Sequence, residues 1–77
     1  MELDTFIKNF AAQFEDAPIE EFAAESEFKL VDGWSSLTAL TIIAMVDEEY
    51  GVIITGEDIQ EAETIKELFE IVRSRFT

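Results

Sequence analysis

Ser36 is the side chain in this sequence best placed for covalent chemistry. It lies in residues 32–37, Asp-Gly-Trp-Ser-Ser-Leu, between a long polar connection and a strongly apolar predicted helix. A serine hydroxyl at the start of a helix usually caps it by accepting a hydrogen bond from a backbone N–H group. The same position also suits a serine that carries a covalently attached group. Both interpretations stay open from this segment alone, because Ser35 could provide the cap instead.

Other catalytic chemistry has little support in the sequence. The chain has no cysteine and no histidine, which removes disulfides, thiolate metal sites, a cysteine nucleophile and the commonest general base. Two carboxylate pairs, Glu20-Glu21 and Glu48-Glu49, could suggest a hydrolase, but adjacent residues on a helix diverge. A chain of 77 residues also leaves little room for a substrate cleft. We therefore predict that the protein is not an enzyme.

The acidic stretch 47–58 does not fit a calcium-binding loop. Its glycine, Gly51, lies one place too early for the glycine that such a loop needs, and apolar residues 52–54 occupy the middle. We expect no specific metal site there.

The net charge of −13, from 18 acidic and five basic residues, narrows the choice of partners. Nucleic acids and anionic membranes are disfavoured, because binding to their phosphates requires lysine and arginine. Basic protein surfaces are favoured, since opposite charge speeds encounter in a salt-sensitive way. A hydrophobic fraction of 48% argues against disorder, and no apolar run reaches membrane-spanning length. We expect a monomer in the cytoplasm, and the N-terminus shows no signal-peptide pattern.

The apolar spacing predicts one all-α domain over residues 1–77, with a small core. A first amphipathic helix is expected at about residues 3–15. A long connection follows over residues 16–35, with a short helical turn near 18–24. A connection of this length in a small domain is usually functional or tied down by buried side chains. The predicted tie-down residues are Ile19, Phe22, Phe28, Leu30, Val31 and Trp34.

The second half of the chain predicts three further helices. The second helix should span about residues 36–50, where a glycine follows as a C-terminal stop. Thr55 could cap a short helix at about residues 57–62. A β-strand over 52–55 is the alternative for the intervening turn, although nothing in the sequence would obviously pair with it. The last helix begins at residues 64–67, Thr-Ile-Lys-Glu, which match a capping box.

The second helix has apolar residues on two opposite sides. A small bundle cannot bury both, so we expect the outer side to be exposed and to bind partners beside Ser36. A central helix covered by the long connection is the alternative. Acids at the far end indicate either part of this partner surface or an ordinary solvated turn. The predicted core side holds Ala39, Ile42, Ile43, Val46 and Tyr50. The predicted outer side holds Leu37, Leu40 and Ala44, with Thr41 and Glu48 beside them and Met45 toward the margin. The acids at the far end of the helix are Asp47, Glu48 and Glu49.

Taken together, these residues resemble the acyl carrier protein family. The resemblance covers nearly the whole chain and is strongest from about residue 32 to residue 72. The family's attachment motif, Asp-Ser-Leu at the start of the second helix, corresponds here to Ser35-Ser36-Leu37. The family's further features follow at matching spacing: an acidic helix end with glycine at 47–51, Ile54 in an aliphatic turn, Glu57-Asp58, and Thr64-Ile65 opening the last helix.

The resemblance implies a small four-helix bundle of acyl-carrier-protein type, with a long loop between helices 1 and 2 and a short third helix. It also implies that Ser36 carries a 4′-phosphopantetheine arm, transferred from coenzyme A by a separate phosphopantetheinyl transferase. Acyl groups would ride on the arm as thioesters, presented to enzymes of fatty acid, polyketide or related synthesis with basic docking surfaces. The implied partner-binding residues are Leu37, Leu40, Ala44, Asp47 and Glu48.

The sequence departs from the family pattern at four positions. Ser35 replaces the acid that normally precedes the modified serine, Thr38 and Thr41 replace common acids, and Thr55 stands where proline is frequent. These departures suggest a specialised carrier from a dedicated pathway. Two alternatives stay open. One is a peptidyl or aminoacyl carrier, which shares the fold and the arm, and the other is an unmodified acidic interaction module in which Ser36 only caps the helix.

Overall fold

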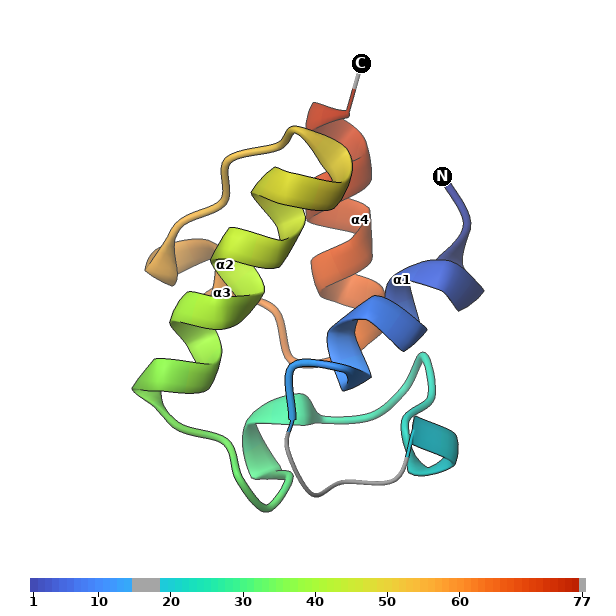
Figure 1. Ribbon diagram of the computed structural model, residues 1–77, viewed down its shortest axis with the longest axis vertical. Helices are drawn as coiled ribbons and strands as arrows, with labels where there is room; N and C mark the ends of the chain where they lie inside the picture. Colours follow the sequence, from blue (N-terminus) through green and yellow to red (C-terminus); the bar gives the residue numbers. More distant parts are fainter. Residues whose placement is uncertain (15–18, 77) are drawn as a thin grey trace.

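The computed structural model describes residues 1–14 and 19–76 and is all-helical over them (Figure 1). No strand occurs in this described part, so the β alternative for residues 52–55 is wrong and the all-α prediction is confirmed. Four α-helices and two short 3-10 turns follow in chain order: α1 (Leu3–Ala11), η1 (Ile19–Glu21), η2 (Phe28–Leu30), α2 (Ser36–Tyr50), α3 (Gly56–Glu61) and α4 (Ile65–Arg75).

The helix bounds differ from the predicted ones mainly in α1. This helix ends at Ala11, and the chain tightens into turns in which Gln13 and Phe14 donate to carbonyls three residues earlier. The predicted end at residue 15 lies outside the described residues, as does the first residue of the turn predicted near 18–24. The η1 turn falls within that predicted range, and α3 begins one residue before its predicted start.

The helices enclose one core. In Figure 1, residues 19–35 of the long connection lie across one end of the bundle. Helix α1 packs against α4 and α2, while α3 packs against α4. Phe6 meets Phe69 edge to face at 5.4 Å between ring centroids, which joins α1 to α4. Each large apolar side chain that folding buries contributes about 1.5–3 kcal/mol. The largest fully buried side chains are Phe6, Phe10, Phe28, Ile42, Ile54, Ile65, Leu68, Val46 and Val72.

Buried aromatic rings tie the long connection to the helices, as predicted for Phe22 and Phe28. The Phe28 ring meets that of Phe10 edge to face at 5.1 Å. Leu30 was predicted to be another tie-down point, and this is wrong, because its side chain is 77% exposed. Side chains in a 3-10 turn are about 120° apart, so a turn that buries Phe28 directs Leu30 elsewhere. The structure does not describe the side chain of Ile19, another predicted tie-down residue.

The connection also satisfies the start of α4. The first amides of a helix have no partner within it. Here the Ile65 N–H donates to the Ser26 carbonyl at 3.2 Å, and the Lys66 N–H donates to the Ala24 carbonyl at 2.9 Å. The Thr64 hydroxyl oxygen accepts from the Glu67 N–H at 3.2 Å, as predicted for the capping box. The reciprocal bond differs, because the Glu67 carboxylate accepts from the N–H of Glu63.

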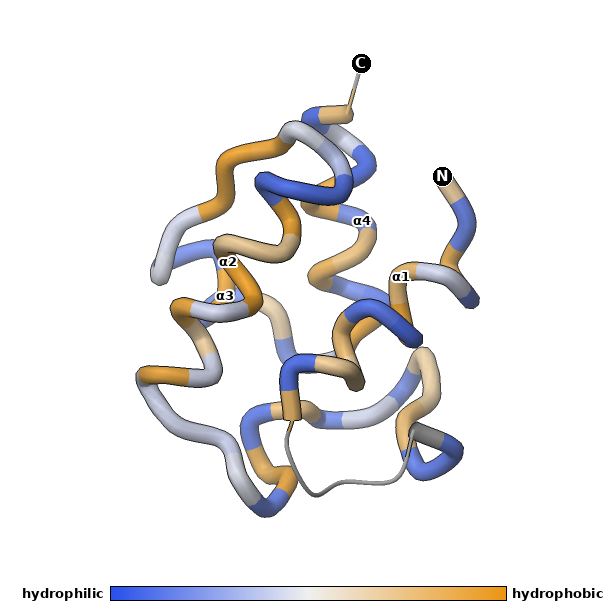
Figure 2. Tube along the Cα trace, in the orientation of Figure 1, coloured by the Kyte–Doolittle hydropathy of each residue, from blue (hydrophilic) through white to orange (hydrophobic). Residues whose placement is uncertain are grey.

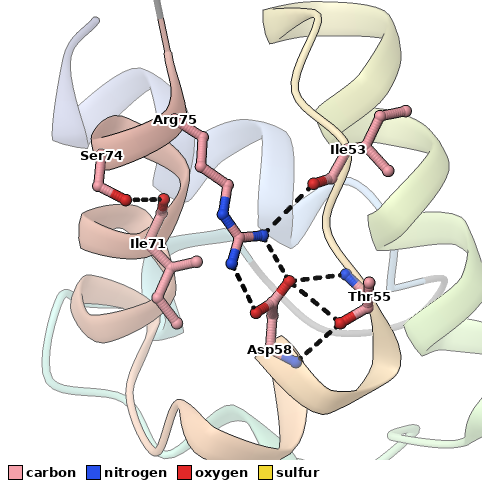
Figure 3. Close-up of polar contacts among 6 residues, drawn as sticks. All are labelled: Ile53, Thr55, Asp58, Ile71, Ser74 and Arg75. Atoms are coloured by element: carbon pink, nitrogen blue, oxygen red, sulfur yellow. Dashed lines mark hydrogen bonds and ion pairs between the residues drawn. The ribbon is translucent and has the colours of Figure 1, made fainter.

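Helix α3 is held at its first turn by Asp58 (Figure 3). The carboxylate accepts from the N–H of Thr55 at 2.8 Å, while the Thr55 hydroxyl oxygen accepts from the N–H of Asp58 at 3.3 Å. The predicted cap at Thr55 is therefore confirmed and forms a complete capping box. A proline at position 55 has no N–H to donate, so this departure from the family pattern creates a bond that the helix uses.

Candidate attachment site

A fixed turn leads into α2. Gly33 has a φ of +93°, a conformation that only glycine adopts without strain. The Trp34 N–H donates to the Val31 carbonyl at 3.1 Å, and the Trp34 ring meets Phe28 edge to face at 5.1 Å. Trp34 is thus half-buried against the core, as predicted for a tie-down residue. These contacts decide where α2 begins relative to the rest of the domain.

Ser35, and not Ser36, caps α2. Ser35 is extended, and its hydroxyl oxygen accepts from the Thr38 N–H at 3.3 Å. The interpretation of Ser36 as the cap is therefore wrong. Ser36 is the first helical residue, its side chain is exposed, and its hydroxyl makes no hydrogen bond to any part of the chain that the structure describes. Nothing in the local structure requires a serine at this position.

The start of α2 suits an anion on the Ser36 oxygen. The N–H groups of Ser36 and Leu37 have no partner among residues 1–14 and 19–76, and the first turn carries no acid. Free N–H groups and the helix dipole both favour negative charge at a helix N-terminus. No charged residue occurs in the helix before Asp47. These residues therefore fit a phosphodiester, despite the strongly acidic character of the chain as a whole.

Thr38 belongs to the candidate site, although the sequence did not single it out as a site residue. It was noted only as the replacement of a common acid, but its side chain is buried and 9% exposed. Its hydroxyl donates to the Gly33 carbonyl at 2.9 Å and lies 3.2 Å from the Ser35 hydroxyl oxygen. A hydroxyl pair three residues apart across a helix start is a signal that could have indicated this. Thr41 donates its hydroxyl to the Thr38 carbonyl at 2.8 Å within the helix.

The outer side of α2 is exposed, as predicted, and the alternative of a fully covered helix is wrong. Leu37 is 71% exposed and Leu40 is 63% exposed. On the core side, Ile42 and Val46 have no exposed surface. Met45 was placed at the margin of the outer side, and this is wrong, because it is buried. The other residues predicted for the outer surface are also exposed: Ala44, Asp47, Glu48 and Glu49.

Ile53 adds an exposed apolar side chain that the sequence reasoning missed. It lies in the loop between α2 and α3 and is 67% exposed, while its neighbours Val52 and Ile54 are buried. Extended backbone directs successive side chains to opposite sides, so an apolar triplet there leaves its middle residue outward. Figure 2 shows hydrophobic colour both at the start of α2 and in this loop.

Within residues 1–14 and 19–76, no group of three potential metal-ligating side chains comes together. None of the helices described has the length and apolar character needed to cross a bilayer.

Comparisons with known proteins agree with this geometry. A family model described as a phosphopantetheine attachment site matches residues 5–72. The chain is similar to the acyl carrier proteins of two strains of Treponema pallidum, one of them the Nichols strain. Identity to each is 28% over 76 residues, covering 96% of this chain and 97% of the relative. No solved structure gives a significant match. The chain therefore belongs to the acyl carrier protein family, whose members are carriers and not enzymes and bear a covalent 4′-phosphopantetheine group.

Proposed function

We propose that this protein carries acyl intermediates on a 4′-phosphopantetheine arm attached to Ser36. The observation that supports the proposal is that the two adjacent serines at the start of α2 have different environments. Ser35 provides the cap, and the Ser36 hydroxyl is exposed and takes no part in the hydrogen bonding described there. Bound to Ser36, the arm supplies the thiol that this chain lacks, on which acyl groups are held as thioesters.

Loading requires a separate phosphopantetheinyl transferase, because this chain has no histidine to act as a base. The Ser36 oxygen attacks the phosphorus of coenzyme A that bears the pantetheine arm. The new bond joins this oxygen to phosphorus, and the bond from phosphorus to the adenosine bisphosphate portion breaks. The transferase accepts the hydroxyl proton. The N–H groups at the start of α2 then stabilise the phosphodiester charge on the product.

The outer side of α2 is the proposed docking surface for the transferase and for synthase enzymes. It combines the exposed leucines Leu37 and Leu40 with Ala44, Asp47 and Glu48. The acids at this end oppose the helix dipole, and the last turn holds no basic residue to offset them. Because Asp47 and Glu48 do not stabilise α2, we propose that their role is to attract a basic partner.

We propose acyl groups of fatty acid, polyketide or related synthesis as the cargo. A net charge of −13 and the acidic end of α2 favour acyl over peptidyl or aminoacyl cargo. The protein would act as a monomer in the cytoplasm, where coenzyme A and partner enzymes are available. The peptidyl or aminoacyl carrier is retained as the second candidate, because it shares the fold and the arm.

Intact-mass analysis of the protein recovered from its native host tests this function. The expected species carries one phosphopantetheine arm, part of it acylated. An amino acid or peptide on the arm would favour the second candidate. A uniformly unmodified protein would contradict the carrier function and favour an acidic interaction module.

A further inference from the structure

We infer that Thr38 is a positioning residue for the loading of Ser36. This inference rests on the proposed attachment at Ser36. Thr38 lies in the first turn of α2 and is 9% exposed, whereas Ser36 and Leu37 are exposed. A side chain so enclosed does not offer a docking contact. Any influence of its hydroxyl on loading must pass through the bonds that it makes to its neighbours.

The direction of each bond in this hydroxyl network follows from the number of protons. The Gly33 carbonyl can only accept, so the single proton of the Thr38 hydroxyl is used there, at 2.9 Å. The Ser35 hydroxyl must therefore donate to the Thr38 oxygen at 3.2 Å. In return, the Ser35 oxygen accepts from the Thr38 N–H at 3.3 Å. Both hydroxyl protons are used, and the network is closed.

The network restrains the backbone that determines where the Ser36 oxygen lies. Gly33 has a φ of +93°, and glycine has more backbone freedom than any other residue. The bond from Thr38 ties its carbonyl to the helix that begins three residues later. Ser36 has no side-chain bond to the described residues that would hold it directly. The orientation of its hydroxyl oxygen therefore depends on the turn and the cap around it.

The network also explains why Ser35 and Thr38 occur together in place of acids. An ionised aspartate at position 35 has no proton to donate to the Thr38 oxygen and would compete with the Gly33 carbonyl for the Thr38 proton. An ionised acid at position 38 could not donate to Gly33 at all. Serine and threonine at these positions thus exchange two charges near Ser36 for a set of bonds within the chain.

Loss of the Thr38 hydroxyl should lower kcat for loading and leave KM nearly unchanged. The Ser36 oxygen must be held close to the phosphorus that it attacks, and small misplacements of reacting atoms reduce rates strongly. An exposed docking residue would instead change KM, because it contributes binding to the partner. This difference separates positioning from docking.

The test measures initial rates of arm addition to the apo protein by intact mass, with coenzyme A and a promiscuous transferase. All variants are compared at a temperature at which each is fully folded. Thr38→Val, which keeps the shape and removes the hydroxyl, should reduce kcat roughly threefold to tenfold. It should also speed amide hydrogen exchange at residues 38 and 39, whose N–H groups are bonded to Ser35. Thr38→Ser should restore kcat to within about twofold. Thr5→Val, at an exposed threonine of α1, is the control and should leave kcat unchanged.

Ser35→Ala breaks the same network from an exposed position and keeps the test decisive if Thr38→Val does not fold. It should lower kcat to a similar extent. Equal kcat for wild type, Thr38→Val and Ser35→Ala would overturn the inference, even if their melting temperatures fall. A loss of rate that Thr38→Ser does not restore would also overturn it. A wild-type protein that accepts no arm, beside a control carrier that does, would overturn the proposed function and this inference together.

Discussion

The guanidinium of Arg75 binds the carboxylate of Asp58 with two hydrogen bonds, at 2.6 and 2.9 Å (Figure 3). This pair joins the last turn of α4 to the first turn of α3. Helix α3 has only six residues, too few to be stable in isolation. Asp58 also takes part in the capping box with Thr55, so one carboxylate both caps α3 and joins it to α4.

Asp58→Ala should lower the free energy of unfolding by about 1–3 kcal/mol, because it removes a capping contact and leaves Arg75 without its partner. Thermal unfolding would show this as a fall of several degrees in Tm. Glu57→Ala is the matched control, since Glu57 is an exposed acid in the same first turn. Equal melting temperatures for both variants would contradict the assigned role of Asp58.

The stabilisation from Asp58 should disappear in acid. The hydrogen bonds from Arg75, with those from Thr55, lower the pKa of Asp58 to about 2 from the usual 3.8. Above about 3.8 the carboxylate is ionised in both folded and unfolded chains, and the stabilisation is complete. As the pH falls from about 3.8 to about 2, the unfolded chain takes up the proton first, so the stabilisation is lost.

The measurement is the difference in unfolding free energy between wild type and Asp58→Asn as a function of pH. Taking this difference cancels the titration of the other acids. It should be constant near neutrality and shrink steadily below about 3.8. A difference that persists unchanged down to about pH 2 would show that the stabilisation from Asp58 does not depend on the charge of its carboxylate.

Local signals account for the elements that the sequence predicted well. The limits of α2 depend on the capping Ser35 at one end and Gly51 at the other, and Gly51 adopts a φ of +65°. The cap at Thr55 likewise involves residues three apart. Contacts between residues far apart in the chain could not be predicted from such local signals. Arg75, for example, binds Asp58, a residue 17 positions away, and no local sequence pattern pairs the two.

The same distinction applies to the site. The spacing of apolar residues predicted the exposed side of α2, because a regular helix converts spacing directly into direction. Leu30 was misjudged because its environment depends on a short turn, whose directions follow from backbone angles that spacing does not contain. The outward position of Leu30 depends on η2. The burial of Thr38 does follow from helical spacing, since it lies four residues before buried Ile42, but its bond to the Gly33 carbonyl does not.

Leu37→Asp should weaken docking far more than it harms folding. The side chain is 71% exposed, so a charge there costs little stability but disrupts an apolar contact with a partner. The expected result is a KM for loading raised at least severalfold, with Tm within a few degrees of wild type. Ile42→Ala is the buried counterpart on the same helix and should cost about 2–5 kcal/mol of stability. A large drop in Tm for Leu37→Asp with unchanged KM would place Leu37 in the core.

The acids at the end of α2 should govern electrostatic attraction to partners. Replacing Asp47 and Glu48 with lysine should raise KM at low salt, and the penalty should shrink as salt screens the charges. Replacing Glu20 and Glu21 with lysine changes the net charge equally on exposed residues of η1 and serves as the control. An identical rise in KM for both double variants would indicate that only overall charge matters.

The identity of the attachment residue is tested most directly by loading three purified apo proteins with coenzyme A and a promiscuous transferase. Intact mass should show one added arm on wild type and on Ser35→Ala, the latter more slowly, and none on Ser36→Ala, which should stay folded and helical. An arm on Ser36→Ala, or a wild type that stays unmodified beside a loaded control carrier, would contradict the tether that we assign to the Ser36 oxygen.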